Sequence, residues 1–226
     1  MSDYTGVDNL EVLTAARRYN AFLVGEVVAA GRDASRALDF GAGIGTFALA
    51  MRDQGVEVEC VEPDDVLRER LEAAGLRTYP SLGPVADASV GYIYSLNVLE
   101  HIEDDAATVG DLYARLRPGG TLFLYVPAFQ VLFSSMDRKV GHVRRYRKGG
   151  LCALLASAGF TVERTEYVDS LGFAASLVYK VVGSRSGDLS EGSVRFYDSV
   201  VFPVSRALDM VLRRFLGKNL LVVARR

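Results

Sequence analysis

Short apolar runs alternate with amphipathic stretches along the first 170 residues of the chain. Apolar or alternating runs predict strands at residues 36–40, 56–62, 76–79, 92–96, 121–126 and 160–167. Apolar residues at helical spacing predict helices over residues 10–30, 46–54, 64–75, 103–116 and 151–158. Strands that alternate with helices in this way indicate an α/β fold, with a parallel sheet covered by helices on both faces.

The last third of the chain departs from this alternation. Residues 170–216 are mostly apolar and predict helices on both sides of a polar break at 184–193, and a final strand is predicted at 219–224. We interpret the chain as a single domain. Its parts are an N-terminal helical cap (1–34), a core (35–168), an apolar helical insertion (170–216) and a final strand (218–226).

Composition narrows the class of protein. Half of the 226 residues are apolar and 24% are charged, as in ordinary globular proteins. The 26 Lys and Arg residues nearly balance the 28 Asp and Glu residues, for a net charge of −2, which argues against a dedicated nucleic-acid-binding protein. Two cysteines and a first segment without a signal-peptide pattern favour a cytoplasmic protein.

A glycine-rich turn follows the first predicted strand, with glycines at Gly41, Gly43 and Gly45. Such a turn lets the backbone approach a ligand and directs the N–H groups of the following helix toward it. Asp39 precedes the turn, and Glu62 lies 21 residues after Gly41, where an acid can bind both ribose hydroxyls of a nucleotide. Glycines alone are a weak signal, because tight strand-to-helix turns also need them for packing.

Four segments in a fixed order make the pattern more specific. They are Ala37–Gly45, Val61–Pro63, Ser95–Ile102 and Leu116–Thr121. Together they resemble the class I S-adenosylmethionine-dependent methyltransferases, particularly the small-molecule branch that includes quinone-biosynthesis enzymes. The resemblance implies a Rossmann-like, doubly wound sheet with an antiparallel last strand. It also implies S-adenosylmethionine as cofactor, S-adenosylhomocysteine as product and a small-molecule acceptor.

The resemblance also assigns cofactor-binding residues. Asp39, Gly41, Ala42 and Gly43 would hold the amino-acid end of the cofactor, Glu62 with Pro63 the ribose, and Asn97 and Leu99 the region near the sulfonium. One position departs from the family pattern, because Gly91 stands where many relatives have an Asp. The adenine contacts would then come from backbone groups near Ser81 and Leu82.

Histidine is the natural base for an acceptor that loses a proton, and the chain has only His101 and His142. Both are candidate catalytic residues, with a structural role as the alternative for His101. Some quinone O-methyltransferases bind a metal through a Glu-x-x-Glu-His arrangement at the position of His101. Here Asn97 replaces the first Glu, so the sequence predicts no metal site.

A basic segment surrounds His142, with six Lys or Arg residues between positions 138 and 148. Relatives carry a similar Gly-His-x-Arg-Arg-Tyr stretch, which supports Arg145 and Tyr146 as ligands of an anionic or hydroxylated acceptor. Anchoring of the loop to the domain is the alternative. Tyr19, in the first predicted helix, is either an acceptor contact or a core residue.

The apolar insertion suggests a bulky apolar acceptor or a homodimer, and contact with a membrane surface is less favoured. A protein of the same fold that binds S-adenosylmethionine without transferring the methyl group is the main alternative function. A nicotinamide-dependent oxidoreductase is disfavoured by Thr46 and by the segments around Asn97 and Pro118. Methylation of nucleic acid is also disfavoured, because the basic segment is small and no Asn-Pro-Pro-Tyr-like element is present.

Overall fold

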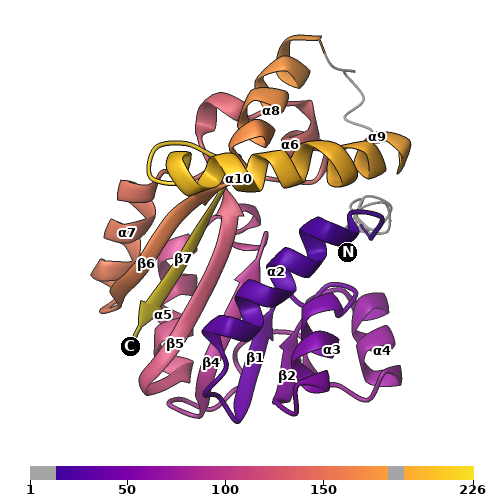
Figure 1. Cartoon of the computed structure of the whole chain (residues 1–226). Coiled ribbons are helices and arrows are strands. Elements are labelled where there is room, and N and C mark those ends of the chain that lie inside the picture. Colours follow the sequence, from indigo (N-terminus) through magenta and orange to yellow (C-terminus); the bar gives the residue numbers. More distant parts are fainter. Residues whose placement is uncertain (1–13, 183–190) are drawn as a thin grey trace.

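A computed structural model describes residues 14–182 and 191–226 of the chain. Its centre is a seven-stranded sheet in the order β3-β2-β1-β4-β5-β7-β6, with helices on both faces (Figure 1). The strands are β1 (Arg36–Phe40), β2 (Glu57–Val61), β3 (Arg77–Tyr79), β4 (Val90–Leu96), β5 (Leu116–Pro127), β6 (Thr161–Val168) and β7 (Asn219–Arg225). β7 lies between β5 and β6 and runs antiparallel to both, which confirms the expected antiparallel last strand.

Helices connect these strands, cover both faces of the sheet and form a layer at one of its ends (Figure 1). They are α2 (Arg17–Ala30), α3 (Thr46–Asp53), α4 (Asp65–Ala73), α5 (Asp105–Arg115), α6 (Ser135–Lys139), α7 (Lys148–Ser157), α8 (Ser170–Val182), α9 (Glu191–Phe196) and α10 (Phe202–Leu212). Two 3₁₀ turns, η1 (Leu99–His101) and η2 (Gln130–Leu132), and a π-helical segment, η3 (Tyr197–Val201), complete the described part. None of the described helices is long and apolar enough to cross a bilayer.

The hydrophobic core has two halves, one on each face of the sheet. Alternation along β4 divides its side chains: Tyr92 and Tyr94 join the half covered by α2 and α3, and Ile93 joins the half covered by α5 and α7. All three side chains are fully buried. Because both faces are covered, the ends of the strands are the regions where a ligand can reach the sheet.

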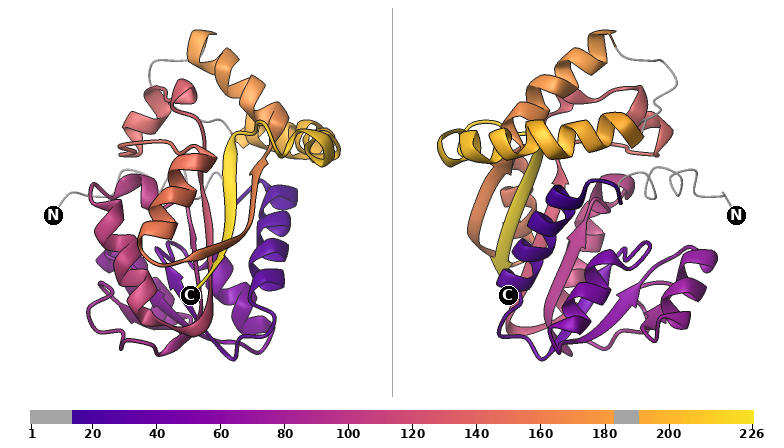
Figure 2. Two further views of the ribbon diagram at one scale, coloured as in Figure 1. Left: turned by 90° about the vertical axis from the view of Figure 1, so that its left-hand side faces the viewer. Right: turned by 45° about the vertical axis from the view of Figure 1, so that its right-hand side comes forward.

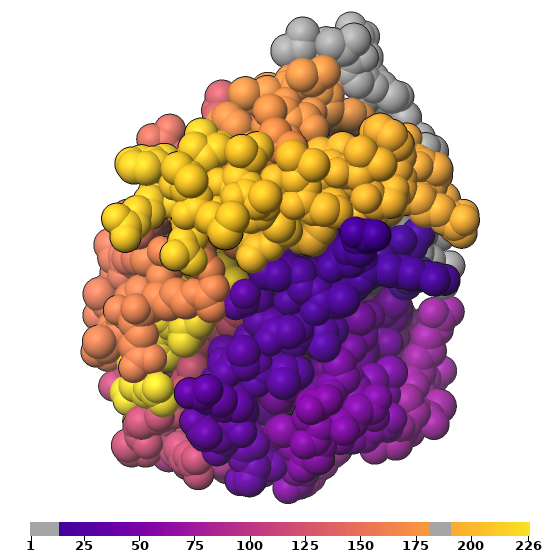
Figure 3. All heavy atoms as spheres, in the orientation of Figure 1, coloured from indigo at the N-terminus to yellow at the C-terminus, as the bar shows by residue number. Residues whose placement is uncertain are grey.

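The predicted apolar insertion forms a layer across one end of the sheet (Figures 1 and 2). α9, η3 and α10 follow one another without a break from Glu191 to Leu212. Asp198 of η3 accepts hydrogen bonds from the backbone N–H groups of Arg18 and Tyr19, at 3.0 and 2.8 Å. This contact ties the insertion to the first turn of α2, and Figure 3 shows the two segments side by side.

The elements differ from the sequence-based predictions at several boundaries. Within the described residues, the first helix begins at Arg17, and positions 10–13 of its predicted range lie outside them. β5 begins at Leu116, the last residue of the predicted helix 103–116, and so starts before the predicted strand 121–126, because Leu116 pairs with Val90 ahead of an irregularity in the ladder. α6 was not predicted, and a capping box between Ser134 and Asp137 begins it. Most of the polar break at 184–193 lies outside the described residues.

Candidate functional site

The glycine turn joins β1 to α3 at the carboxyl end of the sheet. Gly41, Gly43 and Gly45 have φ values of 80°, 54° and 85°, in the left-handed region that favours glycine. A Cβ at Gly41 would lie 2.2 Å from the side chain of Val98, which follows β4. The turn therefore needs glycine at position 41 for its backbone angle and for its close approach to the segment after β4.

Glu62 follows β2 and lies against this turn. Its Oε2 accepts a hydrogen bond from the N–H of Gly43 at 2.8 Å, and its Oε1 accepts one from Asp64 at 3.1 Å. Burial raises the pKa of the carboxyl group. The structure thus brings together Glu62 and the glycine turn, which the sequence placed 21 residues apart, whereas Pro63 beside them is exposed.

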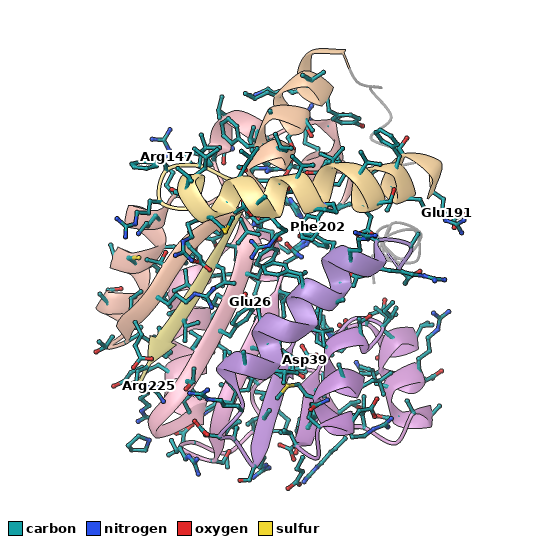
Figure 4. The ribbon with its side chains drawn as sticks, in the orientation of Figure 1. Glu26, Asp39, Arg147, Glu191, Phe202 and Arg225 are labelled. Carbon is teal, nitrogen blue, oxygen red and sulfur yellow. The ribbon has the colours of Figure 1, made fainter. Side chains whose placement is uncertain are left out.

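Asp39 lies on β1 close to α3 (Figure 4). The Tyr94 hydroxyl lies beside its carboxylate, which also accepts a hydrogen bond from the backbone of Ala48 in the first turn of α3; Oδ2 makes no close hydrogen bond to the described residues. The side chain is 2% exposed, and burial raises its pKa to about 8. An unpartnered buried carboxylate is costly unless a cation or donor reaches it, so this group favours a cationic ligand at the turn.

The strand order reverses between β1 and β4, which places a topological switch point at their carboxyl ends. Asn97 follows β4 with φ of 56°, a left-handed conformation that Asn adopts more readily than most residues. Its N–H donates to the carbonyl of Tyr125 at 2.8 Å, and its side chain is exposed. Leu99, two residues on, is buried in the core at 1% exposure.

A cluster of polar side chains, which includes Glu100, His101 and His142, lies beyond the carboxyl end of β4. The ring of His142 donates a hydrogen bond from Nδ1 to Asp137 at 2.8 Å, and its Nε2 lies 3.7 Å from Oε1 of Glu100. The rings of His101 and His142 meet edge to face, with centroids 4.7 Å apart. The structure therefore brings the two predicted histidines together, although they are far apart in the sequence.

The electrostatics of these groups follow from burial and from their partners. Burial, with His142 beside it, lowers the pKa of His101 to about 4. Burial raises the pKa of Glu100 to about 8. Burial alone would raise the pKa of Asp137, but hydrogen bonds from His142 and Arg145 outweigh it and lower that pKa below its ordinary value.

Arg145 and Tyr146 have partners within the protein. The guanidinium of Arg145 donates two hydrogen bonds to Asp137, at 2.8 and 3.1 Å. The Tyr146 hydroxyl lies 2.9 Å from a carboxylate oxygen of Asp105 and 3.2 Å from the carbonyl of Leu99. These contacts favour the alternative in which the two side chains anchor the loop.

Tyr19 lies in the first turn of α2, where the helix meets the insertion. Its hydroxyl is 2.8 Å from that of Tyr125 and accepts a hydrogen bond from Asn219 at 3.3 Å. Its ring packs edge to face on Phe202, whose buried side chain is labelled in Figure 4. Burial raises the pKa of the Tyr19 hydroxyl, so this group stays protonated.

Two acidic residues near the site were missed by the sequence analysis. Asp137 orients His142 and Arg145, and the only local signal for it was the Ser-x-x-Asp pattern that begins at Ser134. Asp169, 1% exposed and with φ of 67°, begins α8 and accepts hydrogen bonds from the hydroxyls of Tyr197 and Ser205. Nothing local in the sequence indicates these last contacts, because they join segments about 30 residues apart.

Comparisons with known proteins show the family. A family model described as a methyltransferase domain matches residues 13–165. The chain is 28% identical over 204 residues to an "uncharacterized methyltransferase" of Mycolicibacterium gilvum, covering 83% of this chain and 75% of that protein. It is 31% identical over 115 residues to a "probable S-adenosylmethionine-dependent methyltransferase" of Mycolicibacterium smegmatis, covering 50% of this chain and 43% of the relative. The match therefore spans less than half of the second relative.

A solved structure shares the fold. The 1,6-didemethyltoxoflavin-N1-methyltransferase of Burkholderia thailandensis, solved with 1,6-didemethyltoxoflavin and S-adenosylhomocysteine, is 16% identical and has a TM-score of 0.59. The superposition covers 97% of this chain and 82% of that one. At this identity the likeness concerns the fold alone.

Proposed function

The chain belongs to the methyltransferase-domain family, and on that premise we propose that it transfers the methyl group of S-adenosylmethionine to a small-molecule acceptor. S-adenosylhomocysteine is the second product. The observation that carries the proposal is the contact between the Glu62 carboxylate and the N–H of Gly43. A carboxylate held against a glycine turn at the switch point of an α/β sheet is suited to the ribose of an adenosine ligand.

The residues of the site fit this cofactor in three respects. The glycine turn leads into the N-terminus of α3, where backbone N–H groups suit the carboxylate of the cofactor. Asp39 is a buried carboxyl group near the turn whose charge a cationic group such as the amino group or the sulfonium would compensate. Each oxygen of Glu62 accepts one backbone N–H and retains a lone pair for a ribose hydroxyl.

We keep the cofactor contacts that the resemblance implies. Asp39, Gly41, Ala42 and Gly43 line the amino-acid end, Glu62 and Pro63 the ribose, and Asn97 and Leu99 the region near the sulfonium. Bound S-adenosylmethionine would supply an electrophilic methyl group to the acceptor, with the neutral thioether of S-adenosylhomocysteine as the leaving group. The protein contributes position and a site that excludes water.

His101 and His142 are the candidate bases for an acceptor that loses a proton. Because Nδ1 of His142 donates to Asp137, the neutral ring keeps an unprotonated Nε2 that can accept a proton. His101, with a pKa of about 4, is neutral near pH 7 and is also able to accept one. Arg145 holds Asp137, so we assign it to positioning the loop that carries His142.

The acceptor itself is proposed to be largely apolar. The Arg145 guanidinium, the group expected to bind an anion, is engaged by Asp137. The Tyr19 hydroxyl is likewise engaged, by Tyr125 and Asn219, and its ring packs on the apolar ring of Phe202 where the insertion meets α2. An acceptor with an apolar body matches these surroundings better than an anionic one.

Release of S-adenosylhomocysteine, measured by mass spectrometry, tests the proposal. The protein is incubated with S-adenosylmethionine and a panel of small acceptors, which includes apolar phenols, apolar amines and carboxylic acids. We expect turnover with an apolar hydroxyl or amine, its loss in Glu62→Ala and its retention in Glu57→Ala, an exposed residue on the same strand. Cofactor binding without turnover of any acceptor would support the binding-only alternative, and failure to bind the cofactor would contradict both.

A further inference from the structure

We propose that Glu100, His101 and His142 form a binding site for one divalent transition-metal ion. One potential ligand atom of each residue lies within 4.8 Å of those of the other two. Two imidazoles and one carboxylate are a ligand set for Zn²⁺, Co²⁺, Mn²⁺ or Fe²⁺. The sequence analysis predicted no metal because Asn97 replaces a ligand found in some relatives. The third ligand proposed here, His142, comes from a different segment of the chain.

Glu100 is the first observation that points to an ion. Its side chain is fully buried, and neither carboxylate oxygen makes a hydrogen bond to another residue in the described part of the chain. Leaving a buried carboxylate without a partner costs free energy, whereas a cation at this position would compensate its charge. Arg145, the nearby cation, directs its bonds to Asp137 and the carbonyl of Ala128.

The orientation of His142 is a second, independent observation. Metal-binding histidines commonly donate the ring N–H that does not face the metal to a carboxylate, which fixes the ring and its tautomer. His142 does this, since its Nδ1 donates to Asp137 at 2.8 Å and its Nε2 points toward Glu100. Asp137 is itself held by Arg145 and by the N–H of Ser134 at 2.8 Å, so the ring orientation is well supported.

The distances between these side chains fit coordination of a metal ion better than direct hydrogen bonds. Nε2 of His142 and Oε1 of Glu100 are 3.7 Å apart, which is too long for a hydrogen bond. Two ligand atoms each about 2.1 Å from a tetrahedral ion lie about 3.4 Å apart, so a small shift of the side chains accommodates the metal. His101 completes the set, and a hydrogen bond between its ring and the backbone of Gly141 orients it.

With an ion in place, His101 and His142 act as ligands and not as bases. Three protein ligands leave a coordination position for water or for an oxygen atom of another molecule. The proposal does not rest on methyl transfer, because the three residues and Asp137 define the site without the cofactor. Binding is therefore measured in the absence of S-adenosylmethionine.

Titration with Co²⁺ tests the site in the full chain, prepared without a histidine tag. We expect one Co²⁺ per chain, with visible d–d absorption, and competition by Zn²⁺. Glu100→Gln and His142→Ala should each weaken binding at least tenfold, and Asp137→Asn by about 10- to 100-fold. Glu103→Gln removes an exposed carboxylate from the same loop and should leave affinity unchanged.

The histidine NMR signals give a readout that does not depend on the variants folding. The chain has two histidines, so Zn²⁺ should shift both sets of ring signals in the wild-type protein. The proposal is overturned if the wild type fails to bind Co²⁺ and Zn²⁺ with 1:1 stoichiometry. It is also overturned if the histidine signals stay fixed, or if folded Glu100→Gln and His142→Ala proteins bind as the wild type does. The last result would place the ion elsewhere, for example on a cysteine.

Discussion

Asp39 should couple cofactor binding to the release of a proton. In the free protein, burial raises the pKa of this carboxyl to about 8, so at pH 7 about 0.9 of the molecules carry it protonated. The cationic amino-acid end of S-adenosylmethionine favours the ionised carboxylate and so lowers its pKa on binding. Each binding event at pH 7 should then release about 0.9 proton from this group.

The sign of the pH dependence follows from this linkage. Because the ionised form binds better, the association constant rises with pH below the pKa of the free protein. The expected increase is about tenfold per pH unit between pH 5.5 and pH 7, and it levels off near pH 8. The free energy of unfolding without cofactor has the opposite pH dependence. Folding keeps Asp39 protonated, so the stabilisation from this group is lost as the pH rises from about 4 to about 8.

Isothermal titration calorimetry in buffers of different ionisation enthalpy measures the protons released. Asp39→Asn keeps the size of the side chain but cannot ionise, so its binding should lose about one released proton and most of the pH dependence. Glu57→Gln is the matched control, since it neutralises an exposed carboxylate on β2 and should keep both the proton release and the pH slope. Equal proton release in wild type and Asp39→Asn would refute the placement of the cofactor's cation at Asp39.

Three further variants test the site and the loop. Glu62→Ala should weaken S-adenosylmethionine binding by about 1.5–3 kcal/mol in calorimetry, while Glu57→Ala should not; unchanged affinity would remove Glu62 from the site. Gly41→Ala should lower the free energy of unfolding in urea by more than Gly55→Ala, because both positions have φ near 80° but only Gly41 lacks space for a Cβ. Arg145→Ala should destabilise the protein by about 1.5–3 kcal/mol, because the buried Asp137 carboxylate loses its charged partner and keeps only the bonds from His142 and Ser134. A change in acceptor affinity with little change in stability would restore the acceptor-binding role.

Local sequence signals predicted the glycine turn, and the structure places Glu62 against it, while cofactor binding by these residues stays a prediction. The left-handed backbone angles at positions 41, 43 and 45 favour glycine. Glu62 reaches the turn because β1 and β2 are parallel neighbours whose carboxyl ends lie at the same edge of the sheet. The alternating pattern also predicted all seven strands. β5 starts earlier than expected because pairing with Val90 outweighs the turn preference of the Pro-Gly-Gly segment.

The acceptor side depends on contacts that no local pattern encodes. The basic segment suggested exposed side chains for binding an anion, yet Arg145 is turned inward by Asp137, a residue eight positions earlier. Glu100 and His142 meet although they are 42 positions apart, because the loop after β5 folds back onto the end of β4. Charge counts along a segment cannot distinguish a solvated cation from a buried one, since that depends on the partner the fold supplies.

Ligand-induced stabilisation tests the central claim most directly. The melting temperature of the purified chain is measured with S-adenosylmethionine, S-adenosylhomocysteine, NAD and NADP, each at saturating concentration. We predict that the two adenosyl ligands alone raise it, since a ligand at 100 times its dissociation constant adds about 2.7 kcal/mol of stability. Stabilisation by NAD or NADP alone, or by none of the four, would contradict the proposed cofactor.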